Sequence, residues 1–438
     1  MTGMAIFCLP VTCFPVADTL RYNIGIADIT PEDSVLLAGF AARKGLSEGV
    51  HRPLKTHCIV FQKDTVRICI ISNDMMEIAL DFAGQLRREI SEKTGIPTHC
   101  IFIHNTHTHS APNTRGDPDK PNARYKQKFA ATVVANAVHT AGDQAAFRPF
   151  SIEVGRGTCD INCNRREADG PIDHTLYAAR LLDKKGRVAV SFINFSCHPV
   201  SLNHRSLMVS TDFPGVARED LEKEWGSPVF YFSGASGNVD PCGALRADTA
   251  YTQERGRQLA QAALEIKFQR LPAQNILSVL NREVRLPFAI EKVTAEAVNA
   301  HADEIKRQTG VSGTWPNDVE GWRKLILERI ANGEVKDYLP FEIAAVNAGG
   351  LVLLFSQGEP FNEYQTFARE SLPETPILFI AYTNGQNSYL PSSHAYRSQG
   401  YLYEKEQMHV YIKAPYPLSE SMPQVYEAAL KELLENIK

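Results

Sequence analysis

Short apolar runs rich in β-branched residues alternate along this chain with amphipathic segments. Such runs are typical of buried strands, and an apolar period near 3.6 residues is typical of a helix with one buried face. The pattern therefore predicts strands and helices in alternation, as in α/β proteins. The predicted strands are 58–62, 66–72, 100–103, 188–194, 229–232, 350–355 and 377–381, and the predicted helices are 75–93, 123–141, 213–224, 251–269, 293–309, 319–332 and 419–437.

From this alternation we predict a mixed, largely parallel central sheet flanked by helices. The sequence shows no internal repeat, low-complexity stretch or long linker, so residues 22–438 are expected to form a single α/β domain. The segment "GVSGTWPNDVEGW", residues 310–322, indicates a surface connection and is the best place for an insertion.

Composition narrows the class of protein. The 438 residues are 44% hydrophobic and 22% charged, which is typical of a globular protein. The net charge of −4 and the absence of a basic stripe argue against a nucleic-acid partner. No apolar run approaches the roughly 18 residues that a membrane-spanning helix needs, so we expect no integral membrane segment. The sequence carries no signal for an oligomeric state.

The first residues leave two interpretations open. Residues 4–17 are almost entirely apolar, as in the central region of an export signal, but a basic region before them is missing. Residues 1–21 are therefore either an export-signal remnant or an N-terminal extension. The first implies a periplasmic or secreted protein, and the second a cytoplasmic one.

Nine cysteines are scattered along the chain without a CxxC pair, which argues against a thiolate zinc cage. Several lie inside apolar runs, so we expect mostly buried, inert thiols. A pairing of Cys159 with Cys163 is the alternative for an exported protein.

Five predicted strands each run into a loop that combines His, Asp, Glu or Tyr with Gly or Pro. The loops read "HNTHTHSAP", "SCHPVSLNH", "SGASGNVDPCG", "SQGEPFNEY" and "YTNGQNSYLP". In open α/β sheets, ligands bind beyond the carboxyl ends of the strands. We therefore expect these loops to converge on one crevice.

The loops carry side chains that zinc prefers. Imidazole nitrogens and carboxylate oxygens bind zinc at about 2.0–2.2 Å, and a catalytic site keeps one position open. The candidate donors are His107 or His109, His198, Glu359 and a tyrosine such as Tyr389. Each of them alone is compatible with an ordinary loop residue, and only their joint placement favours a metal site.

The same loops carry a family resemblance. The segments "THTHSAP", "NFSCHPVSLN", "VSTDFPGVARE", "YFSGASGNVDP", "SQGEPFNEY" and "TNGQNSYLPSSHAY" occur in the order of the signature segments of the neutral/alkaline ceramidase superfamily. Upstream, "GIADITPEDSVLLAGFAAR", "GVHRPL" and "INCNRREADGPIDH" also resemble that family. Its members are zinc-dependent amidases, so the resemblance implies a related catalytic domain from about residue 22 to 403.

Carried over position by position, the resemblance implies one zinc ion per chain. The implied ligands are His107, His198, Glu359 and Tyr389, with His109 beside the metal in contact with substrate or water. His104 falls at a position where the family tends to have a small or apolar residue, and we interpret it as structural.

The resemblance also implies residues that act on or bind the substrate. With His109, the catalytic candidates are Asp240, Asp212 and Arg165, and the substrate-binding candidates are Tyr396, Tyr401, Asn238 and His204. For Asp212 an N-terminal helix cap is the alternative, and for Arg165 a surface ion pair. Backbone amides around Gly237 are candidates for stabilising an oxyanion.

Two departures from the family pattern stand out. Ceramidases read Gly-Asp-Val-Ser-Pro where this chain reads "GNVDP", so Asp240 occupies the position of the family serine and Asn238 that of its aspartate. The family also carries a C-terminal β-sandwich domain, whereas this sequence ends after one predicted helix. We therefore expect a divergent member of the superfamily.

The resulting prediction is a zinc-dependent hydrolase in which metal-activated water attacks an amide or related bond. The substrate is expected to be a polar small molecule, such as an N-acylated or carbohydrate-derived compound. The alternatives are a genuine ceramidase or N-acyl lipid amidase, a non-catalytic binding protein that keeps the metal pocket, and a metal-free protein. Neither a dinucleotide nor a P-loop motif is present.

Overall fold

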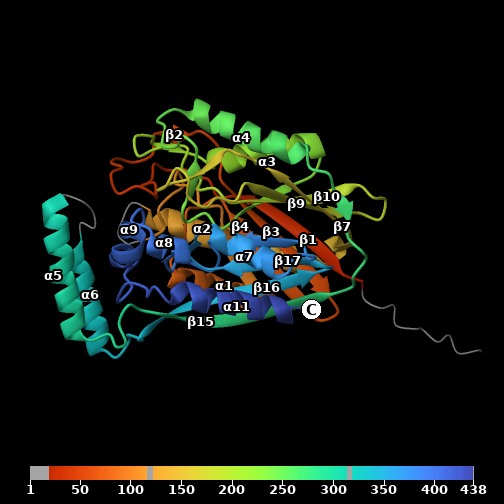
Figure 1. The fold of residues 1–438 in the computed structure, drawn as a ribbon. Coiled ribbons are helices and arrows are strands. Elements are labelled where there is room, and N and C mark those ends of the chain that lie inside the picture. Colours follow the sequence, from red (N-terminus) through yellow and green to blue (C-terminus); the bar gives the residue numbers. More distant parts are fainter. Residues whose placement is uncertain (1–18, 116–121, 313–317, 438) are drawn as a thin grey trace, which may run out of the picture.

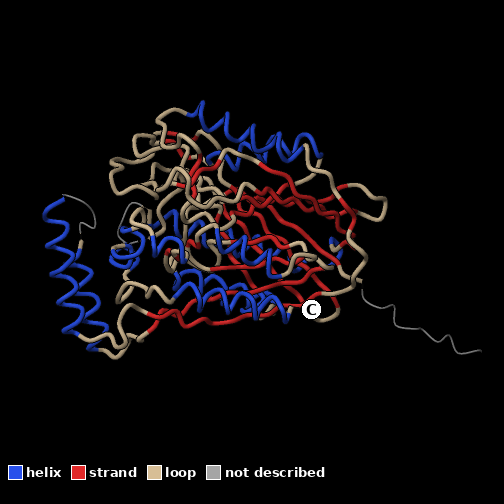
Figure 2. Tube along the Cα trace, viewed as in Figure 1, coloured by secondary structure: helices blue, strands red, loops and turns tan. Residues whose placement is uncertain are grey.

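The computed structural model describes residues 19–115, 122–312 and 318–437. The segment 1–18, which holds most of the predicted signal remnant or extension, lies outside these ranges, as does the middle of the predicted surface connection 310–322. Within the described ranges the chain mixes helices and strands, so the predicted α/β class is confirmed (Figures 1 and 2).

Three larger sheets organise the described residues. The first has the order β5-β4-β3-β1-β6, the second β12-β10-β9-β7-β14 and the third β15-β16-β17-β19. Their bounds are β1 Arg21–Asp28, β3 Lys55–Lys63, β4 Val66–Asn73, β5 Ile101–Asn105, β6 Arg148–Pro149, β7 Ser151–Thr158, β9 Thr175–Leu182, β10 Val188–Phe195, β12 Val229–Ser233, β14 Gln269–Arg270, β15 Leu277–Pro287, β16 Tyr338–Ala348, β17 Leu351–Ser356 and β19 Ile377–Ile380.

Short ribbons extend from these sheets. They pair β2 (Gly49–Val50) with β11 (Met208–Val209), β8 (Asn162–Asn164) with β13 (Val239–Pro241), and β18 (Glu359–Pro360) with β20 (Tyr389–Leu390).

The strand directions correct one prediction. Each large sheet contains one parallel pair, namely β4 with β5, β10 with β12 and β17 with β19. Every other pairing within the three sheets is antiparallel. The prediction of a largely parallel sheet was therefore wrong. The pattern missed strands such as β1, β7 and β15, whose partly exposed faces carry polar residues between the apolar ones.

All seven predicted strands exist, and the parallel pairs are built from them. Five of them, β5, β10, β12, β17 and β19, are the strands whose terminal loops carry the candidate site residues. Loops converge at one edge of a sheet when the strands that precede them are parallel. The three parallel pairs contain all five of these strands, so their loops can meet although the rest of each sheet is antiparallel.

Side chains alternate between hydrophobic cores along the buried strands. In β17, Leu353 packs into a central core that all three large sheets share, whereas Val352 and Leu354 pack into a second core. In β10, Phe192 belongs to the central core and Ile193 to a third core beneath α3 and α4. This two-residue alternation explains why these strands read as continuous apolar runs: both faces are buried.

The helices cover the outer faces of the sheets. In Figure 1, α3 and α4 lie along one side over β9 and β10, α11 lies on the opposite side beside β15 and β16, and α5 and α6 form a hairpin at one end. The bounds are α1 Leu80–Thr94, α2 Ala123–Gly142, α3 Asp212–Trp225, α4 Thr249–Leu264, α5 Ala295–Ser312, α6 Val319–Ala331, α7 Glu363–Ser371, α8 Ser393–Arg397, α9 Leu402–Glu406, α10 Met408–Ile412 and α11 Met422–Asn436. Within the described ranges, no helix combines the length and apolar character of a bilayer-crossing segment.

The cysteines follow the prediction in part. Cys58, Cys69, Cys100, Cys159 and Cys197 are buried free thiols. A disulfide joins Cys163 to Cys242, with Cα atoms 5.1 Å apart, so the alternative pairing of Cys163 with Cys159 was wrong. No local pattern indicates this pairing, because 79 positions separate the two cysteines.

Candidate metal centre

Four loops that follow parallel strands meet at one place in the fold. His107 and His109 follow β5, His198 follows β10, Glu359 follows β17, and Tyr382 follows β19. Backbone hydrogen bonds tie the loops together, for example from Ala381 N to Ser233 O at 3.0 Å and from His107 N to Met75 O at 2.8 Å. The convergence predicted from the sequence is therefore present.

The rings of His107 and His198 are held by backbone carbonyls. His107 Nδ1 lies 2.8 Å from Met76 O, and His198 Nδ1 lies 2.6 Å from Ser236 O. A carbonyl oxygen only accepts hydrogen bonds, so each Nδ1 carries a proton and each ring directs its Nε2 the other way.

These Nε2 atoms converge. His107 Nε2 lies 3.1 Å from His198 Nε2 and 3.2 Å from His109 Nε2. Glu359 Oε2 lies 3.0 Å from His198 Nε2 and 3.4 Å from His107 Nε2. Ring-nitrogen lone pairs and a carboxylate oxygen this close repel one another unless a proton or a metal cation lies among them. The donor set therefore fits a divalent metal ion that takes imidazole and carboxylate ligands.

The three histidines form a candidate metal site, since their ligand atoms lie within 4.8 Å of one another. His109 is the least enclosed of the three rings, and its Nδ1 has no hydrogen-bond partner. Gly39, at φ +101°, packs directly against it: a Cβ at position 39 would lie 2.5 Å from His109 Cβ. This wall leaves no room for a side chain at position 39.

Glu359 is buried and ionised. Burial opposes its charge, but His107 and His198 hold the pKa of its carboxyl well below its usual range. The Gln386 side-chain amide donates to Glu359 Oε1 at 2.6 Å, which leaves Oε2 to face the histidines. Such outer contacts commonly orient metal ligands.

Tyr389 lies beside this cluster, on the strand that pairs with the strand of Glu359. Tyr389 is the register partner of Glu359 in the β18–β20 ribbon, and the centroid of its ring lies 6.5 Å from that of His198. Burial and then the charge of Glu359 raise the pKa of its phenol well above the usual value. The structure thus places all four family-implied ligand positions around one point.

Tyr382 is a site residue that sequence analysis missed. Its ring stacks on His107 with centroids 3.9 Å apart, and its hydroxyl lies 2.7 Å from Ser236 Oγ. Tyr382 and His107 both have positive φ, at 54° and 68°. Left-handed backbone at bulky residues is uncommon and clusters at functional sites. A tyrosine directly after the buried strand, in the segment "AYTNG", is the sequence feature that could have indicated this site residue.

His104 lies behind the site. Its Nδ1 is 2.8 Å from Ala381 O, and Ser233 N donates to its Nε2 at 3.3 Å. The side chain thus links the ends of β5, β12 and β19. Burial lowers its pKa to about 3. This geometry fits a neutral, structural histidine.

Arg165 and Asp240 face the metal cluster from the β8–β13 ribbon. Asp240 Oδ1 lies 3.9 Å from His198 Nδ1. The Arg165 side chain is 17% exposed, donates to Gly237 O at 3.1 Å and lies 3.5 Å from the fully buried Glu404 side chain. Burial disfavours its charge, but Tyr389, Asp240 and Glu404 outweigh that and raise its pKa well above the usual value. A surface ion pair therefore does not describe Arg165.

A cavity of about 390 Å³ opens onto the cluster. Eight of the sequence-predicted residues line it: His107, His109, His198, Glu359, Tyr389, Arg165, Asp240 and His204. The remaining walls are mostly apolar or aromatic, with Phe40, Val200, Leu245, Tyr403, Met408 and Tyr411 among them.

Glu77 is the second missed residue in this cavity. Its carboxyl is buried, which raises its pKa, and lies 2.8 Å from the guanidinium of Arg115. Residues 75–79 were predicted to be helical, but α1 begins only at Leu80. The carbonyls of Met75 and Met76 are thereby free to hold His107, which no helical pattern could indicate.

Four predicted site residues lie outside the cavity lining. The Asp212 carboxylate accepts hydrogen bonds from the backbone amides of Ser201, Leu202 and Phe213, so it ties the start of α3 to the loop after β10. The N-cap of α3 is Thr211 and not Asp212, so the alternative of a helix cap is not what the structure shows. The Asn238 side chain bonds Asn362 and Glu363.

The two tyrosines in this group are also occupied elsewhere. The Tyr396 hydroxyl donates to Leu418 O at 3.1 Å, and the Tyr401 hydroxyl donates to Asn164 Oδ1 at 2.7 Å. Both therefore support the loops around the site without lining the cavity.

The suggested oxyanion role of the Gly237 amide was wrong. Its N–H donates to Pro360 O at 3.0 Å, and a Cβ at this position would lie 2.3 Å from Glu359 O. Gly237 instead lets the loop after β12 approach the Glu359 backbone closely.

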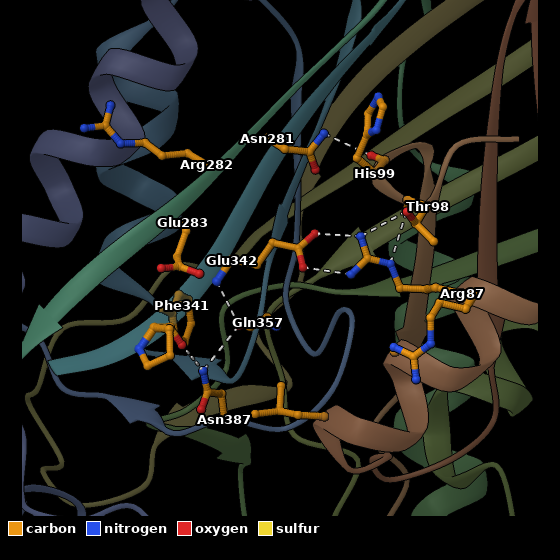
Figure 3. A pocket seen from close by; sticks show the side chains of 14 residues that line it. Arg87, Thr98, His99, Asn281, Arg282, Glu283, Phe341, Glu342, Gln357 and Asn387 are labelled. Atoms are coloured by element: carbon orange, nitrogen blue, oxygen red, sulfur yellow. Dashed lines mark hydrogen bonds and ion pairs between the residues drawn. The ribbon is translucent and has the colours of Figure 1, made fainter. Parts of the chain in front are cut away.

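A second cavity, of about 610 Å³, lies elsewhere, between α1, β15 and β16. Figure 3 shows several of its polar side chains partnered with one another: Arg87 donates to both carboxylate oxygens of Glu342, at 2.8 and 3.0 Å, and to Thr98 O. These contacts attach the third sheet to α1. Within the described ranges, the candidate metal-ligand group is the one around His107, and none lies in this pocket.

Fold and site together define an α/β protein with a buried histidine–carboxylate centre at the strand ends. No family model and no curated protein matches the sequence. Solved structures do match. The neutral ceramidase from Pseudomonas aeruginosa superposes with a TM-score of 0.68 and 19% identity, covering 95% of this chain and 74% of that one. A ceramidase complexed with C2 gives 0.69 and 16%, covering 95% and 75%. The chain therefore has the neutral ceramidase fold.

Proposed function

We propose that this protein is a zinc-dependent hydrolase that cleaves an amide or related bond of a polar small molecule. The observation that carries the proposal is the convergence of three histidine Nε2 atoms and Glu359 Oε2 within a buried cavity. The ceramidase fold supports hydrolysis as the reaction class.

Within this proposal His107, His198, Glu359 and Tyr389 hold one zinc ion. Bound zinc supplies Lewis-acid polarisation of a carbonyl and acidifies water. His109 lies at the open side of the cluster and is the candidate for contact with the reacting water. Burial, followed by the proximity of His107 and His198, lowers the pKa of His109 well below its usual value, so the ring is neutral where it faces the cavity.

Asp240 and Arg165 divide the remaining tasks. Asp240 stands where ceramidases have a serine, and a carboxylate there accepts a proton and returns it to the leaving group. Arg165 is held charged, so its guanidinium stabilises negative charge that develops on the substrate oxygen. Arg165 thus takes the oxyanion-stabilising role, since the Gly237 N–H already donates to Pro360 O.

The charges around the cavity favour a polar substrate. Glu77, Arg165, Asp240 and His204 all line it, and its volume of about 390 Å³ suits an N-acylated sugar or amino compound. The apolar side chains Phe40, Leu245 and Met408 favour the second candidate, an N-acyl lipid amidase, because they offer contact to an acyl chain.

The test is a hydrolysis screen of metal-stripped and zinc-reloaded protein. N-acetylated amino sugars, short N-acyl amines, simple glycosides and N-acyl sphingosine are offered to both forms. We expect the reloaded protein to release free amine from a polar N-acyl compound faster than from N-acyl sphingosine. Equal turnover by both forms, or no turnover of any substrate by the reloaded form, would overturn the proposal.

A further inference from the structure

The disulfide between Cys163 and Cys242 lies next to the two residues proposed to act on the substrate. Cys163 precedes Arg165 by two positions, and Cys242 follows Asp240 by two positions. In the β8–β13 ribbon, Asp240 is the direct register partner of Cys163. One covalent bond therefore links the two paired segments of the ribbon, one next to Arg165 and the other next to Asp240, whose side chains line the cavity.

The β8–β13 ribbon, which positions Arg165 and Asp240, is short. Each strand has three residues, and Pro241, which pairs with Asn162, has no N–H to donate. Isolated two-stranded ribbons are marginal in water. Two local backbone hydrogen bonds flank the ribbon: Arg165 N donates to Asn238 O at 2.9 Å, and Cys242 N donates to Ile161 O at 2.7 Å. Longer-range contacts also reach it, since His198 N donates to Val239 O at 2.9 Å and the Tyr401 hydroxyl donates to Asn164 Oδ1 at 2.7 Å.

The disulfide is also open to reagents. Cys163 is exposed and Cys242 half-buried, whereas the five free cysteines of the described ranges are buried. A reductant therefore reaches this bond without unfolding the cores. The metal ligands are not on the ribbon itself. His107 and Glu359 lie on loops that other contacts hold, and His198 touches the ribbon through its backbone N–H, which donates to Val239 O at 2.9 Å, while Ser236 O holds its ring.

We propose that the Cys163–Cys242 disulfide is a positioning element that holds Arg165 and Asp240 against the metal centre, so that turnover, but not metal binding, depends on its oxidised state. The kinetic part of this inference rests on the proposed function. The structural part, the ordering of the ribbon, does not.

The test compares untreated protein, protein treated with dithiothreitol, and the double variant Cys163→Ser/Cys242→Ser. Peptide mapping establishes the bond, and hydrogen exchange is followed in peptides covering residues 159–166 and 236–243. Zinc content and the cooperative unfolding transition show that each form is folded. The matched control is dithiothreitol applied to the double variant, where no bond remains to be reduced.

We expect faster exchange in both peptides and unchanged zinc content. With the hydrolysed substrate from the screen, we expect kcat to fall by about tenfold to a hundredfold, as for a misplaced catalytic group, with a smaller change in KM. Dithiothreitol should not affect the double variant further. Unchanged exchange after reduction, or an unchanged kcat, would overturn the inference. If no substrate is turned over, the proposed function fails while hydrogen exchange still decides whether the bond orders the ribbon.

Discussion

The Gln386 side-chain amide donates a 2.6 Å hydrogen bond to Glu359 Oε1, and the other oxygen of that carboxylate, Oε2, lies 3.0 Å from His198 Nε2. One amide thus fixes which carboxylate oxygen faces the histidines. The loop after β19, which carries Gln386, contributes to the centre in this way although it supplies none of the three histidines.

Gln386→Ala should weaken zinc binding by about 10- to 100-fold, because outer-shell partners of metal ligands contribute that much. Competition with a chromogenic chelator measures the affinity. Asn387→Ala is the matched control, since Asn387 donates to Pro340 O and does not touch Glu359. Equal zinc affinity of the Gln386 variant and the control would show that this hydrogen bond does not support a metal ligand.

His104 should make stability depend on pH. Its pKa is about 3 in the folded protein against an ordinary value of 6.5, so the unfolded chain binds its proton first as pH falls. Its contribution is complete above pH 6.5 and declines below it, by about 1.4 kcal/mol per pH unit, until pH 3. Urea unfolding between pH 7 and pH 4 should give a shallower slope for His104→Gln than for the wild type. The exposed His139→Gln is the control, and equal slopes in all three proteins would contradict a buried neutral His104.

Asp240→Asn should lower kcat by about 100-fold or more, because an amide cannot accept and return the proton. Zinc content should remain at the wild-type level, since Asp240 is not among the proposed ligands. The exposed Asp160→Asn serves as a control for the loss of one negative charge nearby. Retained ligand binding by a wild-type protein that never turns over any substrate would favour the binding-protein alternative instead.

Asp212→Ala should reduce the free energy of unfolding by about 2–4 kcal/mol, because three backbone amides lose their acceptor in a buried setting. Asp212→Asn should recover part of this, since its carbonyl accepts hydrogen bonds and Asn tolerates the positive φ of 56°. Glu224→Ala, exposed on the same helix, should change stability little. A large fall in kcat with unchanged stability would restore the catalytic role that the structure does not support.

The sequence predicts those parts of the fold that leave a local pattern of apolar residues. Apolar runs predicted every strand that feeds the site, since burial on both faces leaves a local trace. The antiparallel strands β1, β7 and β15 were missed, because their partly exposed faces interrupt the apolar pattern. Sheet direction was then inferred only from the strands that were seen.

The site divides in the same way. His107, His198 and Glu359 carry ligand chemistry at strand ends, which the pattern and the family resemblance both indicate. Tyr382, Gln386 and Glu77 act through stacking, a hydrogen bond and burial, which only three-dimensional packing creates. Asp212 and Asn238 match family positions, yet their side chains are engaged by neighbouring loops.

The most direct test of the central claim is the zinc stoichiometry of purified protein by plasma mass spectrometry after dialysis against equimolar zinc. We expect about one ion per chain in the wild type, about the same in His204→Gln, and a large loss in His107→Ala and in His198→Ala. Wild-type protein without bound zinc, or stoichiometric zinc in both alanine variants, would contradict a metal centre formed by these residues.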